Sequence, residues 1–231
     1  MELIIIILIS LITLVSLPRI LKVDLKKVKE LGMDKELNTF VEKYPSNVEI
    51  CKSILKKINN EKVKIEEDKE AETTLYIALT DKIFIADTKE SFTRIQTMAH
   101  ECLHSIQDRR ILMFNFIFSN IYLIYFAAII ILTILNIATN SLLYLSIFLI
   151  LSMVYYMVRV FLENDAMIKA KYLAKEYMEE AQISSKEEIN KIVDGFENLN
   201  NVGIKCVNYN LFSQILVKVI IFSIVALIFW T

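Results

Sequence analysis

Four long apolar runs restrict what this chain can fold into. They cover residues 3–17, 111–137, 142–161 and 211–230. A helix of about 20 apolar residues spans a hydrocarbon core about 30 Å thick. The chain has only three glycines and two prolines, which indicates long helices rather than a turn-rich β architecture. The sequence therefore predicts a mainly α integral membrane protein with about four transmembrane helices and a small α+β domain.

The polar stretches between these runs divide the chain into regions. We expect an N-terminal anchor at 3–21, a cytoplasmic α+β region at 22–110, a transmembrane helical hairpin at 111–161, cytoplasmic helices at 162–210 and a C-terminal transmembrane helix at 211–230. Lysine and arginine follow the first run and flank the open ends of the hairpin, whereas the hairpin tip has neither. The positive-inside rule therefore places the polar regions in the cytoplasm and the N-terminus and hairpin tip outside.

Charge also limits the partners. The chain carries 26 Lys+Arg against 27 Asp+Glu, so no overall positive field indicates nucleic acid, and the expected partners are the lipid bilayer and a protein or peptide. The three cysteines are scattered and odd in number, which fits a reduced compartment better than a disulfide framework.

The α+β region combines two hydrophobic periods. Residues 24–60 have helical spacing and predict two helices that are separated at Pro45. Alternation at 62–66, 74–79 and 82–86 predicts a small antiparallel sheet. Capping boxes are expected at 87–90, before the helix around residue 100, and at 185–188, before a short helix that ends near Gly195.

The only two histidines of the chain, His100 and His104, lie in an H-E-x-x-H motif. Residues i and i+4 share one face of a helix, so both imidazoles can bind one metal ion. Glu101 leaves the helix about 100° around from His100, which suits a base that contacts water rather than the metal. Cys102 points away from the histidine face and is expected to be a small buried residue. The alternative is an ordinary helix whose histidines are polar surface residues.

A catalytic zinc site usually has three protein ligands and an open position. No third histidine exists, and no Asp or Glu occurs between Asp108 and Glu163. The hairpin returns the chain to the face that it left, so Glu163 is the expected third ligand, with alanines at 166, 170 and 174 allowing a close helix approach. Asp165 is the alternative ligand, or an acceptor for a histidine N–H. Glu163 can also be read as a solvated charge at a helix end.

These residues resemble a known family. The run from His100 to Gln107, followed by a membrane hairpin and then Glu163-Asn164-Asp165-Ala166, is similar to the membrane zinc metallopeptidases of the YugP type. The resemblance implies a zincin-like domain with His100, His104 and Glu163 as zinc ligands and Glu101 as the catalytic base. Leu103 departs from the family, which tends to have glycine there. The hairpin arrangement is more distantly similar to HtpX-type peptidases.

The predicted function is zinc-dependent hydrolysis of peptide bonds in protein substrates at the cytoplasmic membrane face. We expect Zn²⁺ as cofactor, an integral protein of a bacterial cytoplasmic membrane, and a role in membrane-protein quality control. The strand at 82–86 is a candidate for pairing with an extended substrate, and Tyr172 and Tyr177 for stabilising an oxyanion, although packing aromatics are the simpler interpretation. The alternative function is an inactive membrane scaffold or partner-binding protein with a vestigial or structural zinc site.

Overall fold

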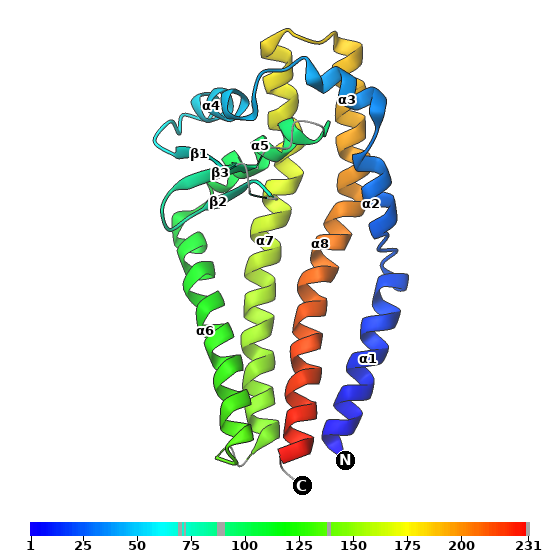
Figure 1. The fold of residues 1–231 in the computed structure, drawn as a ribbon, viewed down its shortest axis with the longest axis vertical. Coiled ribbons are helices and arrows are strands. Elements are labelled where there is room, and N and C mark those ends of the chain that lie inside the picture. The colour runs from blue at the N-terminus through cyan, green and yellow to red at the C-terminus, as the bar shows by residue number, and fades with distance from the viewer. Residues whose placement is uncertain (69–70, 72, 87–90, 138–139, 230–231) are drawn as a thin grey trace. The chain divides into compact units, whose positions relative to one another are not determined.

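The structure is a computed structural model and describes residues 1–68, 71, 73–86, 91–137 and 140–229. These residues form eight helices and three strands (Figure 1). The chain divides into two compact units. We call residues 1–24, 114–161 and 205–231 the helical unit, and residues 25–113 and 162–204 the α/β unit. Three long helices each contribute residues to both units.

The helical unit contains the apolar parts of four helices that are long and apolar enough to cross a membrane. They are α1 (Glu2–Ile20), α6 (Arg109–Ile134), α7 (Ser141–Ala181) and α8 (Lys186–Phe229). Tyr122 of α6 is buried between Phe148 and Tyr155 of α7, with ring centroids 5.3 and 4.8 Å away. Outward-facing side chains such as Ile12 and Ile124 are instead 66% and 68% exposed. An aromatic interior with an apolar exterior suits lipid as the surrounding solvent.

Three short helices open the α/β unit: α2 (Leu25–Gly32), α3 (Lys35–Glu42) and α4 (Asn47–Lys57). The sequence analysis predicted only two helices here, because it treated the segment before Pro45 as one helix where the structure has α2 and α3. The break occurs because Asp34 caps α3, its Oδ1 accepting a hydrogen bond from Leu37 N at 3.1 Å. The break at Pro45 is present, and Ser46 and Glu49 form a reciprocal capping box there.

The sheet has the strand order β1-β3-β2, with β1 at Lys64–Asp68, β2 at Leu75–Ile77 and β3 at Lys82–Ala86. β2 and β3 are antiparallel, but β1 and β3 are parallel, so the prediction of an antiparallel sheet was half wrong. Side chains alternate in both kinds of pairing, and alternation alone therefore does not reveal strand direction. β3 is the central strand with a neighbour on each edge, which excludes it as the strand that pairs with a substrate.

The core of the α/β unit joins β3, helix α5 (Arg94–His104) and the part of α7 beyond residue 161. Ile83, Met98 and Ala170 are all 0% exposed. The predicted alanine stripe of α7 is confirmed, since Ala166 and Ala174 are also fully buried. The capping box expected at 87–90 lies outside the described residues.

Helix α8 runs without a break from Lys186 to Phe229, so the short helix expected to end near Gly195 was wrong. Its predicted start is confirmed, because Ser185 N donates to Glu188 and Glu188 N donates to Ser185 Oγ. Gly195 permits close packing rather than ending the helix. A Cβ there would lie 2.5 Å from Leu37 Cδ1 and 3.1 Å from Phe92 Cε2.

Candidate metal centre

Helix α5 presents two histidines from adjacent turns on one face. The Nε2 atoms of His100 and His104 lie 3.0 Å apart, and the rings are nearly perpendicular at 88°. His104 is buried and His100 is partly buried. Met98 and Cys102 on the same helix are fully buried in the core. This packing fixes the rotation of α5 and with it the direction of the histidine face.

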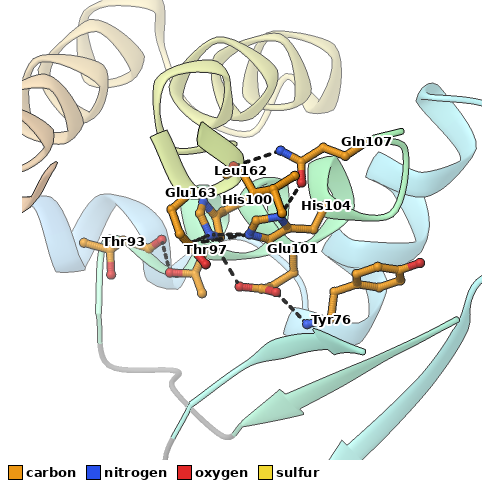
Figure 2. Close-up of polar contacts among 9 residues, drawn as sticks. All are labelled: Tyr76, Thr93, Thr97, His100, Glu101, His104, Gln107, Leu162 and Glu163. Atoms are coloured by element: carbon orange, nitrogen blue, oxygen red, sulfur yellow. Dashed lines mark hydrogen bonds and ion pairs between the residues drawn. The ribbon is translucent and has the colours of Figure 1, made fainter. Parts of the chain in front are cut away.

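Glu163 reaches the histidines from helix α7 (Figure 2). Its Oε2 atom lies 3.5 Å from His100 Nε2 and 3.7 Å from His104 Nε2. The buried alanine stripe that begins at Ala166 faces the same core as α5, so α7 comes close enough for this short carboxylate. The structure thus brings together the three residues that the sequence singled out, although His100 and Glu163 are 63 positions apart (163 − 100).

The three side chains fit a metal ion by both distance and chemistry. One ligand atom from each of His100, His104 and Glu163 can be chosen so that all lie within 4.8 Å of one another. Bonds of 2.0–2.2 Å to a tetrahedral zinc ion would separate neighbouring ligand atoms by about 3.3–3.6 Å. The observed separations of 3.0, 3.5 and 3.7 Å are close to this spacing. The group could therefore hold a metal ion.

Glu101 lies beside this group without belonging to it. Its Oε1 atom is 3.8 Å from His100 Nε2, and its Oε2 atom accepts a hydrogen bond from the backbone N–H of Tyr76 at 2.6 Å (Figure 2). Tyr76 is the middle residue of β2, an outer strand of the sheet. The sheet therefore holds one carboxylate oxygen of Glu101 while the other faces the histidines.

Burial changes the proton affinity of these groups. It raises the pKa of the Glu101 carboxyl, an effect that the nearby imidazoles and the Tyr76 N–H only partly oppose. Burial lowers the pKa of His104, but the nearby carboxylates of Glu163 and Glu101 outweigh it, so the net shift is upward. Two carboxylates that face two imidazoles in a buried place favour a cation among them.

Gln107 links the histidine helix to α7. It lies in the turn after α5, where its Oε1 atom is 2.8 Å from His104 Nδ1. Its Nε2 atom donates to the Leu162 carbonyl oxygen at 2.8 Å and to Asp165 Oδ2 at 3.3 Å. Asp165, the alternative ligand, is not part of the metal-ligating group among the described residues and contacts Gln107 instead. An ion pair with Lys169 and the Gln107 bond lower the pKa of Asp165.

The remaining candidates lie in other surroundings. Tyr177 is buried in the core with its ring centroid 6.1 Å from that of Tyr44, while Tyr172 is 57% exposed and has Lys171 Nζ over its ring. Tyr177 is thus a packing aromatic. Cys102 is buried, as expected, with its sulfur 3.6 Å from that of Cys51.

Sequence reasoning gave no role to Tyr76 or Gln107, two residues that contact Glu101 and His104. Tyr76 acts through its backbone, which no side-chain pattern reveals, whereas Gln107 lies three residues after His104 and could have been proposed as a turn residue beside the motif. Comparisons with protein-family models, with curated proteins and with solved structures find no match for this chain, so its own geometry is what bears on function.

Proposed function

We propose that this chain is a membrane-embedded zinc metallopeptidase that hydrolyses peptide bonds of protein substrates. One observation carries the proposal: a carboxylate, Glu101, stands beside a three-ligand group and is held there by Tyr76 N–H. A purely structural metal site has no use for such a residue. A peptidase needs it to accept a proton from water.

The chemistry follows from the positions of the chain's own groups. Zinc in a site with three protein ligands supplies a Lewis acid for the substrate carbonyl and makes water more acidic. Glu101 takes the proton of the attacking water and then gives it to the leaving amine.

The donor set favours zinc in an open site. Two imidazole nitrogens and one carboxylate oxygen, with the two histidines on successive turns of a helix, are typical of zinc hydrolases. Structural zinc sites usually use four protein ligands, whereas the described residues supply three donors here. The scaffold alternative therefore has less support than catalysis.

The substrate would approach along the sheet. β3 is enclosed by its neighbours, but β2 is an outer strand whose Tyr76 N–H is directed to Glu101. An extended polypeptide segment that adds to the outer edge of β2 would run beside the base and pair on either side of Tyr76, whose own N–H is bonded to Glu101. An unfolded segment of a protein can supply such a strand, so we propose unfolded or damaged membrane proteins as the substrate class.

The proposed location is the cytoplasmic face of a bacterial membrane. Four helices are long and apolar enough to cross a bilayer, and Glu163 follows the end of the helical unit at Phe161 by two residues along α7. Basic residues flank the polar regions, which by the positive-inside rule places Glu163 on the cytoplasmic side.

The test uses the full chain, purified in detergent, and measures metal content together with cleavage of unfolded proteins. We expect one zinc per chain. Glu101→Gln preserves size and polarity, so zinc content should stay the same while cleavage falls by about 10²–10⁴-fold. Glu179→Gln, which changes an exposed carboxylate of the same α7 helix that carries Glu163, is the matched control and should cleave normally.

Three results would count against this function. Cleavage that persists in Glu101→Gln points to a different base or to a contaminating protease. Zinc bound by both proteins without cleavage across a broad panel of substrates favours the scaffold. A metal other than zinc, such as iron, would assign the same three ligands to different chemistry.

A further inference from the structure

The side-chain amide of Gln107 makes contacts in two directions at once. One end meets His104 Nδ1, and the other end meets Leu162 O on α7 (Figure 2). This second end also meets Asp165 Oδ2 of the same helix. All of these residues belong to the α/β unit. Gln107 is therefore the link between one candidate metal ligand, His104, and the helix that supplies another, Glu163.

These contacts fix the orientation of the amide. The Leu162 carbonyl oxygen can only accept a hydrogen bond, and the ionised carboxylate of Asp165 can only accept as well. The NH₂ group of Gln107 must therefore face α7, and its oxygen must face His104. A rotated amide would place oxygen against oxygen at both α7 contacts and lose two hydrogen bonds.

The amide in turn fixes the histidine. Because Gln107 Oε1 is an acceptor, His104 Nδ1 must carry the proton and donate it. The neutral ring then has its lone pair on Nε2, the atom that lies 3.0 Å from His100 Nε2 and 3.7 Å from Glu163 Oε2. This tautomer is the one that can bind a metal ion at the shared position.

We infer that Gln107 is a positioning residue of the metal centre, which holds His104 in the metal-binding tautomer and ties its helix to the helix of Glu163. The inference rests on the proposed function, in that it assumes zinc at this site. Residues that orient a ligating histidine typically contribute 10–100-fold to metal affinity. Gln107 touches no ligand atom of the group, so it acts only through His104 and α7.

The experiment measures the affinity of the full chain for Zn²⁺ in detergent by competition with a chromophoric chelator. We expect Gln107→Leu to weaken zinc binding by about 10–100-fold. Gln107→Met, which keeps the length of the side chain, should lose as much. Thermal unfolding of the metal-free proteins checks that each variant is folded, since loss of a hydrogen bond in a half-buried turn should not prevent folding.

A double variant separates positioning from general structural damage. Gln107→Glu keeps an acceptor for His104 Nδ1 but places its second oxygen against Leu162 O and Asp165. Asp165→Asn then returns a donor at one of these two contacts, while the Leu162 contact stays lost. We expect the double variant to recover part of the zinc affinity that Gln107→Leu loses, because the acceptor for His104 Nδ1 and one link to α7 are restored. A turn damaged by any substitution at 107 would show no such recovery.

The outcomes distinguish this inference from the function on which it rests. A wild-type chain that binds no zinc overturns both. Wild-type zinc binding with unchanged affinity in Gln107→Leu, or a double variant as weak as Gln107→Leu, overturns the role of Gln107 and leaves the metal centre in place. Weaker zinc binding in Gln107→Leu and Gln107→Met, together with recovery in the double variant, supports the positioning role of Gln107.

Discussion

At the scale of single residues, two carboxylates reach the same pair of histidines and differ in what else holds them. Glu163 Oε2 lies at nearly equal distances from both Nε2 atoms, at 3.5 and 3.7 Å. Glu101 is only slightly farther from His100, at 3.8 Å, but the backbone N–H of Tyr76 occupies its other oxygen. Distance to one histidine therefore does not separate the candidate ligand from the candidate base. What distinguishes the two carboxylates is that Glu163 lies between both imidazoles, whereas Glu101 accepts a hydrogen bond from the sheet.

Zinc binding by two alanine variants tests whether Glu163, rather than Asp165, is the third metal ligand. Glu163→Ala removes one of three donors and should abolish stoichiometric zinc in purified protein. Asp165→Ala removes only a 3.3 Å contact to Gln107 and an ion pair with Lys169, so its zinc content should stay near that of wild type. Metal analysis after dialysis compares the two. Full zinc in Glu163→Ala together with loss in Asp165→Ala would move the third ligand to Asp165.

The sequence predicted the three candidate ligands of this centre, but not the residues that contact them and Glu101. The spacing of His100 and His104 follows from helical geometry, and Glu163 follows from the absence of other carboxylates in the hairpin. Tyr76 and Gln107 contribute contacts that exist only once the sheet, the turn and α7 are assembled. Such contacts depend on tertiary structure, so no local pattern contains them.

At the scale of elements, the largest departure from expectation is the continuity of α8. Glycine weakens a helix by about 1 kcal/mol relative to alanine, which made Gly195 a plausible end point. In the structure Gly195 lies against Leu37 and Phe92, and the Phe92 ring stacks on Phe196 at 5.8 Å. The close contact with α3 and the segment before α5 compensates for the weak helix former, so packing prevails over propensity.

The two glycines of α8 give a matched pair for this idea. A Cβ at Gly203 would meet only Met167 Cε, at 3.6 Å, an ordinary contact. Gly203→Ala should therefore stabilise the protein by about 1 kcal/mol. Gly195→Ala gains the same propensity but must displace Leu37 and Phe92, at about 1–3 kcal/mol, so it should be less stable than Gly203→Ala. Denaturant unfolding in detergent, monitored by helical circular dichroism, compares them. Equal stabilisation by the two substitutions would mean that Leu37 and Phe92 move aside at little cost in free energy.

Strand direction shows a second limit at this scale. The three strands were located within a few residues, yet β1 proved parallel to β3. A two-residue turn between the strands at 74–79 and 82–86 indicated the antiparallel pair correctly. The longer connection from β1 to β2 carries no equivalent turn signal, so the placement of β1 depends on packing against α4 rather than on local chemistry.

At the scale of the whole molecule, the charge pattern follows the division into units. The chain passes from one unit to the other after Asp24, Met113, Phe161 and Ile204. Basic residues lie within five positions of each passage: Arg19, Lys22, Lys26, Lys27, Lys29, Arg109, Arg110, Arg159 and Lys205. The described part of the hairpin tip, residues 135–137 and 140, has no basic residue. The positive-inside rule would put all four passages at the cytoplasmic surface, in line with the proposed side of the metal centre.

Cysteine labelling in whole cells tests this topology. The native Cys51, Cys102 and Cys206 are free and buried, so replacing them gives a silent background. New cysteines replace Lys62 and Asn140, both exposed residues. Asn140→Cys should react with a membrane-impermeant reagent in intact cells, because the proposed topology puts the tip outside, while Lys62→Cys should react only after lysis. Reaction of Lys62→Cys but not of Asn140→Cys in intact cells would invert the topology and place the metal centre outside, where the substrate would come from the other side of the membrane.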